Sequence, residues 1–340
     1  MTSEVFDRNI AAAAARLQAG GIVAFPTETV YGLGADISNP SAVRRIFEIK
    51  ERPFNHPLIV HFADISRLRY WSQEIPDAAW KLAERFWPGP LTLILPRSCH
   101  VPRDVTGGQD LVGLRIPDHP IAIALLNELG SEKALAAPSA NRFGRVSPTT
   151  AAHVREELGG AIDMILDGGP CKVGLESTIV SFSGNTTTIL RPGGISLVEL
   201  EEVLHGEVVW PRVNNSTVRV SGSLSSHYAP LTPLEMWKTE TLWRRVRELE
   251  VEGLRTVVLG WSEMGAIISE NNSTLYFSRP HEATGYGREL YATLRRFDQE
   301  KFDRILVEAP PDNPAWLAIT DRLQRASYRP IDRQNLNEKR

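Results

Sequence analysis

The sequence predicts an α/β protein made of two domains. Three observations favour this fold class. The chain has 340 residues, which exceeds the usual size of a single domain. Short apolar segments of strand character alternate with amphipathic helical segments along most of it. A polar stretch rich in Asn, Ser and Gly interrupts this pattern, so we expect a first domain at 1–212, a linker at 213–233 and a second domain at 234–340.

The first domain begins with an Ala-rich helix, Arg8–Ala19, that ends at two glycines. A buried strand and a loop, Thr27–Gly34, follow. Ser41 is a good N-cap for a helix that places Val43, Ile46 and Phe47 on one face. Further helices are expected at Asp77–Phe86, Pro120–Leu129 and Thr149–Leu158, and strands at Ile22–Phe25, Leu58–Phe62, Leu91–Leu95, Val112–Ile116, Leu135–Ala137, Met164–Asp167, Thr178–Ser181 and Thr187–Leu190.

Some of these strands are joined by turns that are too short for a helix, so the first sheet is expected to be mixed rather than purely parallel. The second domain is smaller, and its pattern resembles a doubly wound fold. Its helices are expected near Glu240–Glu250, Gly287–Asp298 and Pro314–Ser327, and its strands at Thr256–Leu259, Thr274–Phe277 and Arg304–Glu308.

Composition excludes several classes of function. The net charge of −3 gives no general attraction to nucleic acid or to anionic membranes. Cys99 and Cys171 lie far apart in the sequence, which argues against a structural zinc site and a disulfide framework and fits a reducing cytosol. No apolar stretch approaches the roughly 20 residues that span a bilayer. We therefore expect a cytoplasmic protein without membrane contact.

The run Lys50–His61 places two cations, two prolines and an apolar strand within a dozen residues. Lys50 and Arg52 follow a helical segment, and such a grouping is typical of sites for polyphosphates or carboxylates. The alternative is that both cations only compensate the dipole at the end of the helix. His61 ends the strand, and the sequence leaves it as a core histidine, a ligand contact or a proton acceptor.

Other candidate side chains stand at the ends of predicted strands, where open α/β sheets bind ligands. Ser139 and Asn141 follow an apolar strand and offer a hydroxyl and an amide, although an ordinary turn also favours these residue types. Arg115 lies between apolar neighbours and needs either a bound carboxylate or an internal Asp or Glu as its partner. Arg191 is a similar candidate. Ser177 has no assignable base, so a turn serine is the simpler interpretation.

The sequence contains no GxxxxGK[ST] phosphate loop, no G-x-S-x-G elbow and no kinase-type HRD set. Instead, several segments together resemble the YrdC-like family in its long, two-domain form. They occur in the family's order over about the first two-thirds of the chain, and His227-Tyr228-Ala229-Pro230 matches the linker of the long form. The matching segments are Phe25–Leu33, Lys50–His61, Trp87–Thr92, Val112–Pro117, Ala137–Asn141, Ser147–Thr149 and Leu190–Gly193.

The resemblance implies a twisted, open, mixed α/β sheet (the YrdC-like fold) followed by a smaller Rossmann-like domain. It implies an enzyme that joins L-threonine, bicarbonate or CO2, and ATP into threonylcarbamoyl-AMP and releases pyrophosphate. Mg2+ would accompany ATP, with no metal ligand from protein side chains. The product would pass to a transferase complex that makes the t6A modification of tRNA, and a weak contact with tRNA itself is a further expectation.

The family's functional residues carry over by position. Those that would act in catalysis by holding the nucleotide and its phosphates are Lys50, Arg52, Ser139 and Asn141. Those that would hold threonine are Thr29, His61, Arg115, Ala137 and Ser177, with Arg115 as the partner of its carboxylate. Further contacts to ATP would come from His56, Leu111, Ser147 and Arg191, and a lid would include His227 and Tyr228.

Two departures from the family pattern concern these roles. Leu111 stands where many members have Thr, so Leu111, like Ala137, could offer only backbone groups. The linker reads Ser221-Gly222-Ser223 where some members have Pro-Gly-Met.

Two other functions remain open: an RNA-binding module of the same fold, since a basic concave surface also suits RNA, and a carbamoyl-transfer maturation factor. The family's maturation factors carry zinc-finger and acylphosphatase segments, for which this chain has neither the cysteines nor the room.

Overall fold

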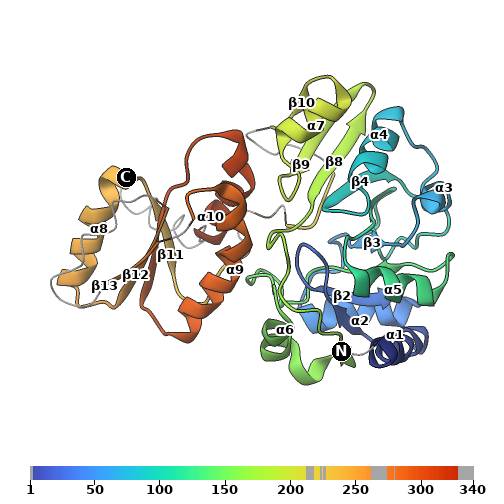
Figure 1. The fold of residues 1–340 in the computed structure, drawn as a ribbon, viewed down its shortest axis with the longest axis horizontal. Helices are drawn as coiled ribbons and strands as arrows, with labels where there is room; N and C mark the ends of the chain where they lie inside the picture. Colours follow the sequence, from blue (N-terminus) through green and yellow to red (C-terminus); the bar gives the residue numbers. More distant parts are fainter. Residues whose placement is uncertain are drawn as a thin grey trace. The chain divides into compact units, whose positions relative to one another are not determined.

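The computed structural model describes residues 3–211, 218–222, 224, 227–261, 274–278 and 280–327. The chain divides into two compact units (Figure 1). The first holds the described residues up to Phe143 and from Ser147 to Gly222, and the second holds Gly144–Val146 and the described residues from Leu224 on. Of the predicted linker 213–233, residues 213–217, 223, 225 and 226 lie outside the described residues, and the predicted domain boundaries remain predictions.

The first unit is built on a mixed sheet, as predicted. Its strand order among the described residues is β10-β9-β8-β4-β5-β3-β6-β2-β1-β7. Parallel pairs such as β3·β5 and β4·β8 stand beside antiparallel pairs such as β4·β5 and β8·β9. The strands are β1 (Val23–Phe25), β2 (Gly32–Asp36), β3 (Ile59–His61), β4 (Leu91–Pro96), β5 (Leu111–Arg115), β6 (Leu135–Ala136), β7 (Met164–Ile165), β8 (Thr178–Ser183), β9 (Thr186–Arg191) and β10 (Val208–Val209).

The helices of this unit are α1 (Ser3–Gln18), α2 (Pro40–Lys50), α3 (Leu68–Trp71), α4 (Asp77–Phe86), α5 (Pro120–Leu129), α6 (Ala151–Leu158) and α7 (Leu197–Leu204), with 3₁₀ turns at Ile65–Arg67 and Gly159–Ala161. Helices α4 and α5 match the prediction at both ends, and α2 and α6 lie within two residues of it, although the N-cap of α2 is Asn39 rather than the predicted Ser41. Helix α1 begins five residues before the predicted Arg8, and α3 was not predicted. Helix α7 was not predicted, although Ser196 and Glu199 form a capping box at its start.

The prediction of a loop over Thr27–Gly34 was wrong in its last three residues, because β2 begins at Gly32. Glycine has low strand propensity, which hid this strand. The structure gives the reason for both glycines. A Cβ atom at Gly32 would lie 3.2 Å from the Phe25 ring, and one at Gly34 would lie 2.9 Å from it. The two glycines therefore make room for Phe25 on the neighbouring strand β1.

The second unit carries a parallel sheet with the strand order β11-β14-β12-β13. Figure 1 shows α8 on one side of this sheet and α9 and α10 on the other, which confirms the doubly wound pattern. Strand β11 was not predicted, and the predicted helix Pro314–Ser327 starts with a 3₁₀ turn. The elements are β11 (Leu234–Trp237), α8 (Thr239–Val251), β12 (Thr256–Gly260), β13 (Thr274–Ser278), α9 (Ala283–Gln299), β14 (Arg304–Glu308), the 3₁₀ turn Pro314–Trp316 and α10 (Leu317–Ser327).

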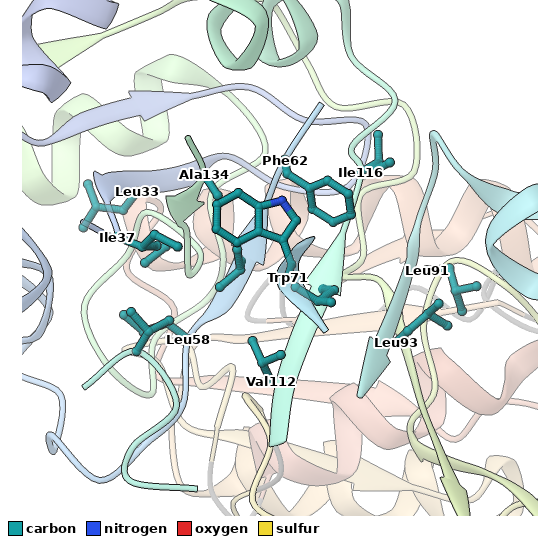
Figure 2. Close-up of a cluster of buried hydrophobic side chains, with 14 of the residues drawn as sticks. Leu33, Ile37, Leu58, Phe62, Trp71, Leu91, Leu93, Val112, Ile116 and Ala134 are labelled. Carbon is teal, nitrogen blue, oxygen red and sulfur yellow. The ribbon is translucent and has the colours of Figure 1, made fainter. Parts of the chain in front are cut away.

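One face of the first sheet packs against the main hydrophobic core. Figure 2 shows part of this core, with Trp71 and Phe62 surrounded by aliphatic side chains. Because strand residues alternate between faces, Val60 on β3 and Leu114 on β5 point into this core. Their neighbours His61 and Arg115 therefore point to the opposite face.

The opposite face has two halves. Around β1, β2 and β6 it is covered by α1 and α5, which pack beside each other and enclose a second apolar cluster that includes Phe25 and Leu135 (Figure 1). Around β3, β5, β4, β8 and β9 it carries a small apolar cluster closed by Val218 and Val220 from the segment 218–222. Polar side chains of the predicted site share this second half.

Candidate active site

Two of the predicted site residues, His61 and Arg115, lie where the cover of α1 and α5 ends. The Phe25 ring belongs to the cluster under these helices, and its centroid lies 6.3 Å from that of His61 in an edge-on contact. His61 and Arg115 are paired residues on the parallel strands β3 and β5. Both side chains are buried. His61 and Arg115 are therefore polar groups on a sheet face that is mostly apolar.

Arg115 is held by three oxygen atoms. Its Nη2 donates to Glu28 Oε1 at 2.7 Å and to Thr29 Oγ1 at 2.8 Å, and its Nε donates to the Gly89 carbonyl at 3.4 Å. Of the two partners that the sequence left open for this arginine, the structure contains the internal acid, Glu28. The Glu28 and Arg115 side chains are 4% and 5% exposed, so the ion pair is buried.

Thr29 is oriented by its neighbour Thr27. Thr27 Oγ1 donates to the Val30 carbonyl at 2.6 Å, so the 2.8 Å contact between the two threonine hydroxyls must use the proton of Thr29. Thr29 Oγ1 is then free to accept the hydrogen bond from Arg115. This network fixes the guanidinium group and the hydroxyl relative to each other.

His61 is neutral at ordinary pH. Burial, and then the charge of Arg115, lower the pKa of His61 to about 3. Its Nδ1 lies 3.3 Å from the Ile59 carbonyl. Because a carbonyl only accepts, Nδ1 carries the proton, and Nε2 is left as an acceptor. The imidazole can thus accept a hydrogen bond from a hydroxyl or ammonium group but is a poor base.

Lys50 is the last residue of α2 and is 1% exposed. Helix α2 starts with the Asn39 side chain as its N-cap and ends at Glu51, whose left-handed φ of 55° turns the chain. Lys50 Nζ donates to the backbone carbonyls of Ser139, at 2.5 Å, and of Asn141. Lys50 thus contacts Ser139 and Asn141, but through their backbone oxygens and not through the hydroxyl and amide side chains. Burial, and then the charge of Arg52, lower the pKa of Lys50.

Arg52 and Arg191 meet at one residue of the segment 218–222. Arg52 Nη2 donates to the Pro57 carbonyl at 2.8 Å and to Ser221 Oγ at 3.1 Å. Ser221 Oγ donates in turn to the Pro57 carbonyl at 3.0 Å. Arg191 Nη1 donates to the Ser221 carbonyl at 3.0 Å. Two cations that lie far apart in the sequence thus share one anchor.

Arg191 also donates hydrogen bonds to Ser177. Its Nη2 donates to the Ser177 carbonyl at 2.8 Å, and Ser177 Oγ lies 2.7 Å from Thr92 Oγ1 on β4. Ser177 and Thr92 are fully buried. The hydroxyl of Ser177 is therefore part of a hydrogen-bond network that runs from β9 to β4.

Ser147, Ala137 and His56 make separate contacts. Ser147 Oγ donates to Glu176 Oε1 at 2.6 Å. The Ala137 amide donates to the Ile59 carbonyl at 2.9 Å. The His56 ring meets the edge of Phe143 at 5.2 Å, and burial, followed by the charges of Arg52 and Arg219, lowers the pKa of His56.

Leu111 takes part through its apolar side chain. It packs on the small apolar cluster beside Val218. It also borders a cavity of about 960 Å³ that Ile94, Leu190 and Val218 help to line. The cavity is large enough for a small-molecule ligand, but its described lining includes none of the four cations of the candidate site.

His227 and Tyr228, the predicted lid residues, belong to the second unit. The His227 amide donates to the Arg325 carbonyl at 3.2 Å. The Tyr228 ring stacks on Tyr291, with centroids 5.9 Å apart, and the Arg322 guanidinium lies 4.7 Å from its centroid. Their role as a lid remains a prediction.

Sequence reasoning missed four side chains that hold the predicted residues: Glu28, Thr92, Glu176 and Ser221. Glu28 and Glu176 are acids directly beside strands, and both are buried. A buried acid needs a cationic or hydroxyl partner. The partners lie 87 and 29 residues away in the sequence, so a single sequence could not identify them.

Within the described residues, no three His, Cys, Asp or Glu side chains are grouped so that they could hold a metal ion. No helix in the same part of the chain is long and apolar enough to cross a membrane.

Two family models match the chain one after the other. The model for Sua5, YciO and YrdC proteins, described as "Telomere recombination", matches residues 15–193. The model described as "Threonylcarbamoyl-AMP synthase, C-terminal domain" matches residues 195–327. The chain belongs to the Sua5/YciO/YrdC family.

Relatives of similar length sharpen this assignment. The threonylcarbamoyl-AMP synthase of Pyrococcus abyssi is 42% identical over 330 residues, which cover 94% of both chains. That of Bacillus subtilis is 42% identical over 94% of this chain and 93% of its own. A crystal structure of P. abyssi Sua5 complexed with L-threonine matches with a TM-score of 0.84 and 39% identity over 94% of both chains. These relatives match this chain over nearly its full length, across both of its units.

Proposed function

We propose that this protein is an L-threonylcarbamoyladenylate synthase, a nucleotidyltransferase that converts L-threonine, bicarbonate or CO2, and ATP into threonylcarbamoyl-AMP and pyrophosphate. The observation that carries the proposal is that Arg52 and Arg191 share Ser221 as a partner, that Lys50 lies close enough to Arg52 to feel its charge, and that Arg115 is held beside His61 by Glu28 and Thr29. Full-length relatives with this activity in their names support it.

Threonine binds beside Arg115 in this proposal. Nη2 and Nε of the guanidinium are taken by protein oxygens, and Nη1 is left to donate to the threonine carboxylate. His61 Nε2 accepts a hydrogen bond from the hydroxyl or ammonium group of the ligand. Thr29, Ala137 and Ser177 complete the walls.

ATP binds along Lys50, Arg52 and Arg191. The three cations neutralise its phosphates, and Ser139, Asn141, Ser147 and His56 provide polar contacts around them. The adenosine part is assigned to the cavity bordered by Leu111, because the family resemblance places an ATP contact at that position. Mg2+ enters as part of the Mg–ATP substrate, since this ion is commonly held by substrate phosphates with one or two carboxylates.

The reaction needs orientation and charge neutralisation more than a protein nucleophile. The threonine ammonium group releases two protons to solvent, one before and one after its nitrogen forms a bond to the carbon of CO2, and the resulting carbamate keeps one N–H. A carbamate oxygen then attacks the α-phosphorus of ATP, the bond to the bridging oxygen of the β-phosphate breaks, and pyrophosphate leaves with that electron pair. Holding both reactants in line supplies most of the acceleration.

The product serves the t6A modification of tRNA in the cytoplasm and passes to a transferase complex, with at most a weak contact between this protein and tRNA. Threonylcarbamoyl-AMP is a reactive mixed anhydride, so a transferase has to follow.

The test is to incubate the purified protein with Mg–ATP, L-threonine and ¹⁴C-bicarbonate. We expect pyrophosphate release that depends on threonine, together with a ¹⁴C-labelled product that also carries AMP. ATP turnover that is independent of threonine, or a product without the label, would refute the proposal. Retention of labelled tRNA without any turnover would favour the RNA-binding alternative.

A further inference from the structure

Glu28 is a buried carboxylate that has no place yet in the proposed reaction. It lies three residues after β1 and is 3% exposed. Its backbone carbonyl accepts from the Val173 amide, which fixes the chain there. Its Oε1 accepts from Arg115 Nη2 at 2.7 Å. Its Oε2 is buried and has no hydrogen-bond partner among the described residues.

The contacts of Arg115 show what this ion pair does for the guanidinium. Glu28 and Thr29 take the two N–H groups of Nη2, and Gly89 takes the one of Nε. Nη1 has no hydrogen bond within the described part of the chain, so both of its N–H groups remain available. Because a guanidinium is planar, fixing Nε and Nη2 also fixes the direction in which Nη1 points.

The charge of the pair matters as much as its geometry. Arg115 with Glu28 is neutral as a unit, which suits a zwitterionic amino acid whose own net charge is zero. An arginine without this carboxylate would be a strong site for any phosphate oxygen. In the proposed reaction ATP is the second substrate and pyrophosphate is a product, and both are assigned to Lys50, Arg52 and Arg191.

We propose that Glu28 is a positioning and specificity-determining residue: it aims Arg115 at the carboxylate of a zwitterionic α-amino acid and, by cancelling the arginine's charge, keeps phosphate anions out of the amino-acid pocket. This inference rests on the proposed function, since it assigns the amino-acid pocket of that same site.

The test measures binding of L-threonine by calorimetry, with and without inorganic phosphate, to the full chain and to E28Q. Gln keeps the size of the side chain and an oxygen acceptor but removes the charge. The matched control is D36N, because Asp36 is a buried acid at the end of β2 that pairs with Lys133 at 3.0 Å outside the site. A third variant, E28D, keeps the charge but shortens the reach.

We expect phosphate to leave threonine binding unchanged in the unmodified protein and in D36N. In E28Q the Kd for threonine rises about tenfold, as expected for the loss of a charge-assisted contact, and phosphate raises it further by competition. In E28D the Kd rises, but phosphate still does not compete. With threonine saturating, E28Q keeps kcat within a few-fold, since its loss lies in KM.

An E28Q protein that binds threonine as the control does and ignores phosphate would overturn the inference. If E28Q does not fold, E28D decides, because competition by phosphate in E28D would overturn the inference equally. Failure of the unmodified protein to bind threonine would instead refute the proposed function.

Discussion

Lys50 and Arg115 are both buried cations of the candidate site, but they are stabilised in opposite ways. Lys50 donates to two neutral carbonyl oxygens, whereas Arg115 donates to a carboxylate. Burial lowers the pKa of Lys50, which shows that its charge is poorly compensated in the protein alone. We propose from this difference that an anionic ligand completes Lys50 and that a zwitterionic ligand completes Arg115.

The largest effect is expected from K50M, which removes the charge and keeps the volume. Turnover should fall by about two to three orders of magnitude, because a buried donor to the phosphates is lost. Pyrophosphate release that depends on threonine measures this. The same variant should lose little stability, because removing a poorly compensated buried ammonium group offsets the loss of the donor to the Ser139 and Asn141 carbonyls. Activity within a few-fold of normal would show that Lys50 does not serve the phosphates.

The reverse pattern is expected for R115M. Removing the guanidinium leaves the Glu28 carboxylate buried without its partner, and breaking a buried ion pair in this way costs about 3–5 kcal/mol. Urea unfolding of R115M and K50M in parallel compares the two sites directly. Equal stabilities for both variants would contradict the difference that we draw between the two cations.

A pH-dependent effect is expected from His61. Its pKa is about 3 in the folded chain and 6.5 in the unfolded chain, so between these values only the unfolded chain binds the proton. Stability is therefore fully present above pH 6.5 and is lost as the pH falls toward 3, by up to about 1.4 kcal/mol per pH unit from this residue. The loss on acidification should be smaller in H61N. Identical pH profiles of unfolding would show that His61 titrates normally.

The smallest effect is expected from S221A. The variant loses one hydrogen bond to Arg52, which keeps its bond to the Pro57 carbonyl. A hydrogen bond of this kind contributes about 0.5–1.5 kcal/mol, so the KM for ATP should rise about two- to tenfold while the KM for threonine stays constant. S327A, at a half-buried serine that ends α10 of the second unit, serves as the control. A change in the KM for threonine alone would show that Ser221 serves threonine binding and not ATP binding.

Local signals predicted much of the fold. Asp77–Phe86 and Pro120–Leu129 were predicted with their observed ends, because Pro, Gly and aromatic residues mark those ends clearly. Strand β2 was missed because its two glycines serve the neighbouring Phe25 ring rather than their own strand. The contact between these glycines and Phe25 depends on tertiary packing, so the local sequence pattern does not show it.

The site was predicted only as separate segments until the family resemblance joined them. Lys50 meets Ser139 and Asn141 across 89 and 91 residues of sequence, and no spacing rule connects them. Arg115 was correctly judged to need a partner, but the choice of Glu28 depends on how β1 and β5 lie in the folded sheet. Residue types therefore indicated the chemistry, and topology decided the pairs.

The central claim is that Lys50 serves the phosphates and Arg115 serves the amino acid. It is tested most directly by measuring, by calorimetry, the binding of a non-hydrolysable ATP analogue and of L-threonine to K50M and to R115K, which keeps a positive charge beside Glu28. We expect K50M to lose the nucleotide and keep threonine, and R115K to lose threonine and keep the nucleotide. Loss of both ligands in both variants, or the opposite pairing, would contradict the account.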